Sequence, residues 1–424
     1  GFWGAAPIVQ GLVPGFTPEK QNLTVSIFRI LSWVVVFISL TSFFKALNSY
    51  YEEYTLSASS GLVDTTVMIG VTLFSWKIWG IYGAAWGAVI GTAAALLFQA
   101  FFLFRKHRLF FQKAAFKNPW LWKLVYFLFP MGIIWAFQQF PLVILNRFGS
   151  GMWEGTISAL NISHTLTTVP MGLVSHTVLF TIFPALAKQA NERSAEEAKA
   201  TFFLTLRGGF LILIPAGFLL TALAQPLAVL FFEGGGIAQE GTRRIANSLA
   251  CFGWATFALY ADLFMTQSLI AVRKSFPAIL LSGMRAVLTY ATGYFLSTYW
   301  DYQGIAFSFS LALVINLFLF FPVFFRLSPF GQGWKSLFVY TLKIILASSP
   351  LFLLGWGVNR WPLTEWLGFP NLFIFLVADI SSAAALLLCF SLRDTHNDPL
   401  LDRLTYSQLS LHFSCAQYFL HLAR

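Results

Sequence analysis

Long apolar runs are the feature of this sequence that most restricts what it can fold into. Eleven stretches are long enough for a helix to cross a bilayer, which takes about 20 apolar residues. The expected spans are 22–44, 57–76, 80–104, 121–146, 156–187, 202–224, 245–271, 276–299, 302–325, 335–357 and 367–391. Only 10% of the residues are charged, whereas soluble domains carry about 25%. The chain is therefore predicted to be an all-α polytopic membrane protein.

Basic residues predict which side of the membrane each loop faces. The densest basic segment, residues 105–123, contains six Lys and Arg residues and is placed on the cytoplasmic side, where it would contact anionic lipids. Alternation then puts 17 of the 27 Lys and Arg residues in cytoplasmic loops and the tail, 6 in outer loops and 4 within spans. This bias predicts a cytoplasmic C-terminus. Because the net charge of +10 resides largely in these loops, we expect no nucleic-acid partner.

The segment 126–186 contains the polar side chains that point most directly to function. It is predicted to form two spans joined by a Gly-rich turn, and polar groups at membrane depth usually face a cavity or a neighbouring helix. These polar residues are Gln138, Gln139, Asn161, His164, Thr165, Thr167, Thr168 and His176. We interpret this hairpin as the wall of a polar path through the membrane.

Three Pro-X-Gly sequences, which start at Pro130, Pro170 and Pro215, lie inside apolar runs. Proline removes a backbone hydrogen bond, so we expect each of them to break its helix, as in discontinuous transporter helices. The charged segment Gln189–Ala200 is expected to be a helical connector that lies along the membrane surface.

Ionisable side chains inside spans are functional candidates by default. Arg29 lies in the first two turns of its span, where it snorkels to the interface or turns inward. Asp64 is interpreted as a hydrogen-bonded contact between helices or as an ion or proton site. Asp262 is a second candidate for ion coupling, or the partner of Arg285 in a buried ion pair. Arg207 begins the span 202–224 and is a candidate for substrate binding.

The sequence contains no pattern typical of an enzyme or a metal site. Cys251, Cys389 and Cys415 are scattered and have neither a disulfide framework nor metal-ligand spacing. The 17 acidic residues are dispersed, whereas a membrane-embedded transferase needs paired carboxylates or a His with an acidic partner. We therefore predict a protein that is not an enzyme and that has no metal and no cofactor.

A weak internal repeat relates two parts of the chain. At a shift of 221 residues the aligned pairs are Trp33 with Trp254, Gly83 with Gly304, Ala85 with Ala306 and Arg105 with Arg326. If the repeat unit is six helices, both copies enter the membrane from the same side and form two parallel lobes. The first copy would then begin about a hundred residues before Gly1, which predicts that two helices and most of a third precede this chain.

The predicted organisation has five parts. Residues 1–104 form an incomplete first lobe with the end of span 3 and spans 4–6, 105–123 a basic cytoplasmic loop, 124–326 a second lobe with spans 7–12, 327–392 two additional transmembrane helices, and 393–424 a cytoplasmic tail. The tail is interpreted as a poorly ordered terminus, with an interfacial helix as the alternative.

The ordered set of these features resembles the MurJ (MviN) lipid II flippases, members of the same superfamily as the MATE drug exporters and the polysaccharide flippases. The resemblance covers most of residues 1–326. It is carried by AAPIVQGLVPGF, FRILSWVVVFISLTSFFKALNSY, YGAAWGAVIG, the FPMG…GS hairpin, VPMGLVSHTVLFTIFPALAK, TLRGGFLILIPAGFLL and QPLAVLFFEGGGI. It implies a fourteen-helix protein of the bacterial inner membrane. Such a protein moves the undecaprenyl-linked peptidoglycan precursor lipid II to the outer leaflet by alternating access between two lobes.

In that family a central cavity carries basic side chains for the diphosphate, and the last two helices form a groove for the lipid tail. Arg and Lys suit a diphosphate on general grounds. The resemblance places the cavity arginines of the first two helices before Gly1. An Asp-Arg pair that often precedes the proline corresponding to Pro170 is replaced here by His164 and Thr165. His164 is interpreted as a substitute cation, or as a hydrogen-bond partner of Asn161 or of a backbone carbonyl.

The leading hypothesis is a lipid II flippase for cell-wall synthesis. Its substrate-binding candidates are His164, Thr165, Gln138, Gln139, Asn161, Arg29 and Arg207. The alternative is a related MATE-type or polysaccharide exporter, in which Asp64 or Asp262 would be the cation-coupling carboxylate. A third hypothesis is a transport-inactive scaffold of the cell-wall machinery, which the expected missing helices and Thr165 support.

Overall fold

A computed structural model describes residues 4–51, 53–107, 119–191, 195–232, 237–327 and 334–360. All regular secondary structure in these ranges is α-helical, which confirms the predicted fold class. The chain divides into two compact units, Gly1–Ile157 and Ser158–Arg424. The predicted span 367–391, the tail 393–424 and most of the basic loop 105–123 lie outside the described residues.

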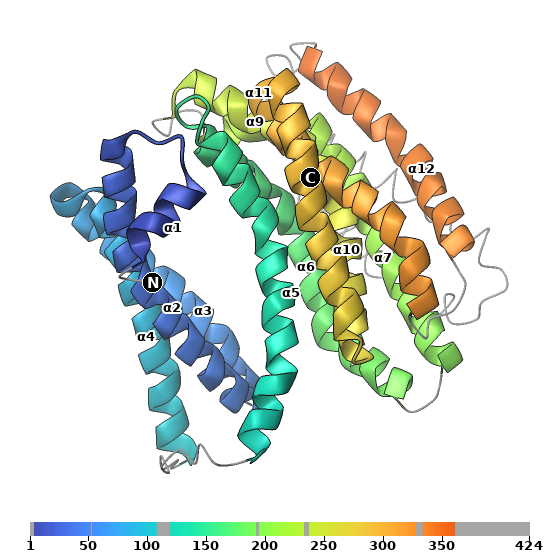
Figure 1. The fold of residues 1–424 in the computed structure, drawn as a ribbon, viewed down its shortest axis with the longest axis horizontal. Helices are drawn as coiled ribbons and strands as arrows, with labels where there is room; N and C mark the ends of the chain where they lie inside the picture. Colours follow the sequence, from blue (N-terminus) through green and yellow to red (C-terminus); the bar gives the residue numbers. More distant parts are fainter. Residues whose placement is uncertain are drawn as a thin grey trace, which may run out of the picture. The chain divides into compact units, whose positions relative to one another are not determined.

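The first unit is built around a hairpin formed by its third and fourth helices. Its helices are α1 (Ala5–Leu12), α2 (Pro18–Tyr50), α3 (Tyr54–Trp79), α4 (Ile81–His107) and α5 (Pro119–Gly149). Helix α4 packs along both α2 and α3 (Figure 1). The predicted spans 22–44, 57–76, 80–104 and 121–146 correspond to α2, α3, α4 and α5.

Three glycines at a spacing of four bring α4 close to α3. A Cβ atom added to Gly83 would lie 2.4 Å from Ser75 Oγ, and one added to Gly91 would lie 2.7 Å from the Asp64 carbonyl oxygen. Gly87 makes the same close approach to α3. Small residues at such spacing allow the backbones of membrane helices to touch. Asp64 therefore lies at a helix–helix contact, which was one of its two predicted roles.

The second unit contains the remaining helices. These are α6 (Thr156–Asn191), α7 (Ala195–Ala222), α8 (Ala224–Phe232), α9 (Gln239–Gly253), α10 (Thr256–Ala271), α11 (Ser275–Leu327) and α12 (Trp334–Arg360). Helix α7 is central, because it packs against α9, α10 and α12. Its core is aromatic: the Phe202 ring stacks on Phe264 and Phe324 at centroid distances of 5.2 and 5.3 Å.

The helix breaks predicted at the three prolines do not occur, and the sharp bend lies elsewhere. Helices α5 and α7 continue through Pro130 and Pro215, and α6 continues past Pro170, so one missing N–H does not interrupt them. The sharp bend, 53°, instead separates α9 from α10 within the predicted span 245–271. The charged segment Gln189–Ala200 is not a separate connector, because its ends belong to the last turn of α6 and the first turns of α7.

Helix α11 is a hairpin of two helices. Trp300 and Asp301 have non-helical backbone angles, and the Thr292 hydroxyl donates to the Ser308 carbonyl across the hairpin. A Cβ at Gly304 would lie 2.0 Å from the Leu296 carbonyl oxygen, so the two helices touch directly beside the turn. The break separates the predicted spans 276–299 and 302–325.

The turn of this hairpin matches the turn of the α3–α4 hairpin at the shift predicted for the internal repeat. Gly80 has φ 51° and ψ −128°, and Asp301, 221 positions later, has φ 50° and ψ −136°. Gly83 and Gly304 also align at this shift, and each packs against the residue eight positions earlier. The two hairpins therefore share both a turn conformation and a packing contact, which supports the repeat.

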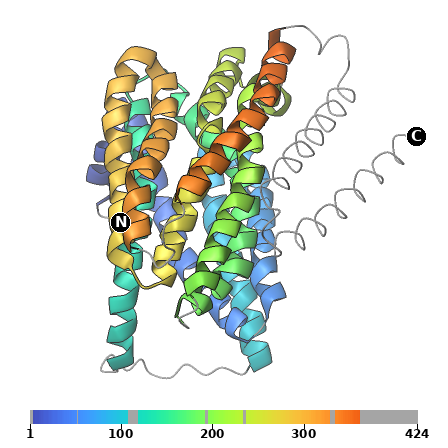
Figure 2. The same cartoon turned by 90° about the vertical axis from the view of Figure 1, so that its right-hand side faces the viewer.

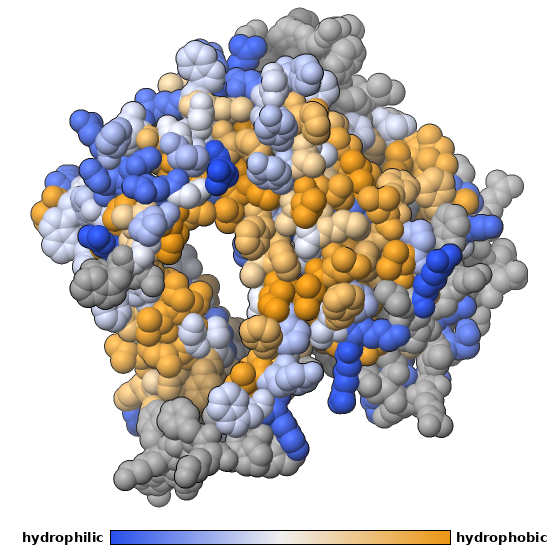
Figure 3. All heavy atoms as spheres, viewed as in Figure 1, coloured by the Kyte–Doolittle hydropathy of each residue, from blue (hydrophilic) through white to orange (hydrophobic). Residues whose placement is uncertain are grey.

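Six of the described helices are long and apolar enough to cross a membrane, or seven if the bent α9–α10 pair forms one span. One of the six is α11, whose 52-residue segment contains two predicted spans. Since a helix rises about 1.5 Å per residue, 52 residues are more than twice the length that a bilayer core of about 30 Å requires. Apolar residues occupy much of the helix surface on the face shown in Figure 3, with hydrophilic residues mainly towards its edges. The molecule is a multi-pass membrane protein.

Candidate functional site

A polar stripe on α6 is the strongest site candidate in the second unit. Asn161, His164, Thr165 and Thr168 recur at i, i+3, i+4 and i+7, so they share one face of the helix. Thr165 is exposed and the other three are half-buried. The Thr165 and Thr168 hydroxyls each donate to a carbonyl of the preceding turn, at 2.8 Å, which satisfies their protons within the helix. The stripe lies in the predicted span 156–187, where polar groups that are not fully buried can contact a polar ligand.

The His164 ring packs at nearly right angles against two phenylalanine rings. It meets Phe252 of α9 at a centroid distance of 5.8 Å and Phe309 of α11 at 5.2 Å, both nearly at right angles. Within the described part of the chain the ring makes no hydrogen bond, so the predicted bond to Asn161 or to a carbonyl is not formed. Neither ring nitrogen is therefore engaged by a described residue.

Helix α6 is fixed in this orientation by the residue before the histidine. Ser163 is fully buried, and its hydroxyl donates to the Ile245 carbonyl of α9 at 2.8 Å. Because Ser163 and His164 are consecutive, this contact sets the rotation of α6 about its axis and thus the direction in which His164 projects.

A buried charged network lies between α10 and α11. Arg285 Nη1 donates to Asp262 Oδ2 at 2.6 Å, and Asn316 Nδ2 donates to Asp262 Oδ1 at 3.1 Å. The three residues are 6%, 3% and 1% exposed. The predicted ion pair between Asp262 and Arg285 is therefore confirmed. Since both carboxylate oxygens already accept hydrogen bonds, Asp262 is not an open cation site in this structure, and its ion-coupling role stays a prediction.

The other candidates are divided between the units. Arg29 on α2 and Gln139 on α5 are exposed, and Gln138 on α5 is half-buried. These three and Asp64 belong to the first unit. The structure thus brings His164, Thr165 and Asn161 together on one helix face, and their predicted association with Arg29, Gln138 and Gln139 stays a prediction.

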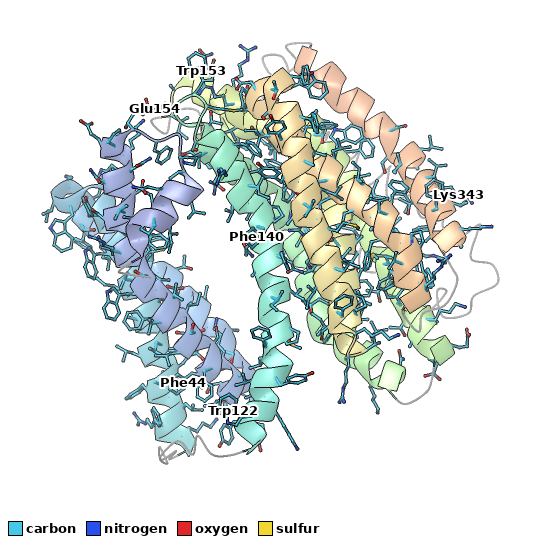
Figure 4. The ribbon with its side chains drawn as sticks, in the orientation of Figure 1. Phe44, Trp122, Phe140, Trp153, Glu154 and Lys343 are labelled. Atoms are coloured by element: carbon cyan, nitrogen blue, oxygen red, sulfur yellow. The ribbon has the colours of Figure 1, made fainter. Side chains whose placement is uncertain are left out.

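The first unit also contains a clamp between the segment from the end of α1 to the start of α2 and the segment formed by the end of α5 and the connection that follows it. Figure 4 shows Trp153 and Glu154 in this connection. The clamp contacts are Arg147 Nη1 to the Gly11 carbonyl at 2.9 Å, Gly15 N–H to Ser150 Oγ at 3.2 Å, and Lys20 Nζ to Glu154 Oε1 at 2.5 Å. The hydrogen bond from Lys20 holds the pKa of the Glu154 carboxyl below its ordinary value. The contact is therefore complete at neutral pH and is lost as the pH falls through that lowered pKa.

Arg207 is positioned away from the α6 stripe, on the side of α7 that faces α12. Its Nη2 donates to Ser336 Oγ at 2.8 Å, and its guanidinium lies 5.5 Å from the centre of the Tyr340 ring. Sequence patterns alone did not predict these partners, which are 129 and 133 positions away. Asn316 was also missed, although an amide in the middle of the apolar run 302–325 is a recognisable signal.

Comparison with known sequences decides the family. The sequence model of the family described as lipid II flippase MurJ matches residues 1–375. The chain belongs to the MurJ family. This confirms the resemblance described from the sequence, and it assigns the chain to a family of membrane transport proteins.

Curated members of the MurJ family from several bacteria are similar over most of the chain. The probable lipid II flippase MurJ of Buchnera aphidicola subsp. Schizaphis graminum is 24% identical over 80% of this chain and 67% of its own length. The probable lipid II flippase MurJ of Borreliella burgdorferi is 24% identical over 91% of this chain and 76% of its own length. The lipid II flippase MurJ of Burkholderia cenocepacia is 22% identical over 83% of this chain and 70% of its own length.

Solved structures show the same fold. A MurJ lipid II flippase in an inward closed conformation superimposes with a TM-score of 0.73 at 18% identity, covering 93% of this chain and 80% of that structure. An inward-facing multidrug resistance MATE family transporter of the MOP superfamily superimposes with a TM-score of 0.60 at 15% identity, covering 76% of this chain and 76% of that structure. The MurJ family chain therefore has the polytopic transporter fold that these proteins share.

Proposed function

We propose that this chain translocates lipid II, the undecaprenyl-diphosphate-linked peptidoglycan precursor, across the bacterial inner membrane for cell-wall synthesis. The observation that carries the proposal is the match to the lipid II flippase MurJ family along residues 1–375. The transport step is alternating access between two lobes. The C-terminus is cytoplasmic in this proposal, as the distribution of basic residues predicts.

The α6 stripe is the part of the chain that contacts the headgroup. His164 supplies a ring nitrogen to a polar group of the substrate, with Asn161 and Thr165 beside it on the same face. Two observations support this role. The ring is oriented by Phe252 and Phe309, and its nitrogens bond to no described residue. Arg29, Gln138 and Gln139 are further candidates for substrate contact, in the first unit.

The test is growth of a bacterium depleted of its own lipid II flippase and supplied with the reading frame that contains this chain. We expect the unchanged protein to restore growth and His164→Ala to weaken the rescue. His164→Phe is the decisive variant, because a phenyl ring preserves the packing against Phe252 and Phe309 but has no nitrogen. We expect it to reach wild-type abundance in the membrane and to rescue as poorly as His164→Ala.

Each other outcome has a defined meaning. Full rescue by His164→Phe would show that the residue packs and does not contact the headgroup. Absence of rescue by the unchanged protein, despite normal abundance, would overturn the flippase proposal. Association of that protein with cell-wall enzymes would then favour a transport-inactive scaffold.

A cation-coupled exporter is the second candidate, favoured by the fold shared with a MATE family transporter. In that case Asp262 or Asp64 would exchange its present contact for a cation during the cycle. Proton or sodium gradients imposed on vesicles that contain the protein test this hypothesis. Gradient-driven export of a cationic drug that Asp262→Asn or Asp64→Asn abolishes would support it, and export unaffected by either variant would exclude these carboxylates.

A further inference from the structure

A cation without an acidic partner lies between α7 and α12. None of the ion pairs among the described residues includes Arg207. Its contacts there are the Ser336 hydroxyl and the face of Tyr340, and its Nε is buried without a hydrogen-bond acceptor. A guanidinium has five N–H donors, so this one retains donors that no described residue accepts from.

The position of Ser336 along α12 indicates the membrane depth of this cation. Ser336 is two residues after Trp334, the first residue of α12, which is about 3 Å along the helix axis. Arg207, which contacts it, is twelve residues after the start of α7, and the turns before it contain Glu196, Glu197 and Lys199. Charged residues are costly in hydrocarbon, so these first turns lie outside the bilayer core. Arg207, about 12 Å beyond Lys199 along α7, and Ser336, near the start of α12, are therefore towards the headgroup end of their helices.

The face of α12 that meets Arg207 carries a second cation. Ser336, Tyr340 and Lys343 recur at i, i+4 and i+7 and share one face of α12. Lys343 is exposed (Figure 4), and a lysine two turns deeper can extend its ammonium towards the headgroup region. Helix α12 packs against α7 (Figure 2), so the face of α12 that contains Ser336 and Tyr340 meets α7 at Arg207, with Lys343 further along the same face.

We propose that Arg207, Ser336 and Lys343 bind the phosphate group of a membrane lipid at the surface of the α7–α12 pair. A guanidinium binds phosphate oxygens through two parallel hydrogen bonds, and stacking on Tyr340 fixes its plane. Ser336 accepts from Arg207 and keeps its own proton to donate to the phosphate. This site is separate from the α6 stripe and does not require lipid II transport, because an anionic phospholipid also presents negatively charged phosphate oxygens, as the diphosphate of an undecaprenyl lipid does.

The experiment measures lipid binding to the purified, detergent-solubilised protein by native mass spectrometry. Phosphatidylglycerol and undecaprenyl diphosphate are titrated separately, which distinguishes the two sources of phosphate. We expect Arg207→Gln to weaken binding of at least one of them about tenfold, as the loss of a charge-assisted hydrogen bond predicts. Lys77→Gln removes one exposed positive charge from α3 and is the matched control, expected to bind as the unchanged protein does.

Arg207 also joins α7 to α12, so a second variant separates binding from folding. Ser336→Asp places a carboxylate beside the guanidinium, which preserves the contact between the helices and occupies the donors that a phosphate would use. We expect a protein at least as stable to heat as the unchanged one, with lipid binding weakened about tenfold. Undiminished binding of both lipids by Ser336→Asp and by a folded Arg207→Gln would overturn the proposal and leave Arg207 as a structural contact.

Discussion

At the scale of the residue, Asp262 shows why a membrane bundle keeps a charge in its core. The carboxylate is 3% exposed, yet Arg285 and Asn316 satisfy both of its oxygens. A buried pair adds little net stability, because desolvation offsets most of the attraction, but the loss of one partner leaves an uncompensated charge. The pair therefore specifies how α10 and the two halves of α11 fit together more than it strengthens them.

Breaking the pair from either side should be costly, and removing both charges should not. We expect Asp262→Leu or Arg285→Met alone to destabilise the protein by about 3–5 kcal/mol. The double variant Asp262→Leu/Arg285→Met should recover most of that loss. Thermal unfolding of the three proteins in one detergent measures the coupling. Additive losses in the double variant would show that the two side chains act independently.

At the scale of the element, glycines that touch a neighbouring backbone determine the two helical hairpins. We expect Gly304→Ala to destabilise the protein by about 1–3 kcal/mol, because its Cβ would lie 2.0 Å from the Leu296 carbonyl oxygen and the hairpin would have to open. Gly208→Ala is the control, since that Cβ meets no atom within 4 Å and alanine favours a helix. The melting temperatures of both variants test this. Equal shifts of the melting temperature in the two variants would mean that helix propensity alone, and not the close approach at Gly304, is involved.

Most elements were predictable from the sequence, and their irregularities were not. Apolar length and turn residues located α2 to α5 and the break near residue 300, because these depend on local composition. The bend between α9 and α10 was not predicted, since residues 245–271 form one apolar run and the bend has no proline. The prolines led to the opposite error, because breaks were predicted there that the structure does not have. Their helices continue, so a lost hydrogen bond is a poor guide when the rest of the helix is packed.

The candidate site was predictable only in part, because some of its contacts join positions that are far apart in the sequence. The polar stripe of α6 follows from helical periodicity, so His164, Asn161 and Thr165 could be grouped from the sequence alone. The aromatic partners of His164 come from α9 and α11, and the partners of Arg207 from α12. Contacts between positions so distant in the sequence depend on how helices pack, which a single sequence does not specify.

At the scale of the whole molecule, the distribution of basic residues predicts the orientation in the membrane. In a variant whose three cysteines are replaced by serine, we expect Lys77→Cys to react with a membrane-impermeant maleimide on intact spheroplasts. Glu197→Cys, at the start of α7, should react only after the membrane is permeabilised. Both positions are exposed, so differences in burial do not account for the contrast. Labelling in the reverse pattern would invert the proposed topology.

The matching turns at Gly80 and Asp301 carry a consequence for the ancestry of the molecule. A positive φ suits glycine, yet one of the two positions now holds an aspartate and keeps the same backbone angles. The same turn is therefore formed by two different amino acids, and in each hairpin a glycine three residues later, Gly83 or Gly304, packs closely against the preceding helix. Duplications in such proteins should thus be recoverable from matching dihedral angles long after identity at the corresponding positions has decayed.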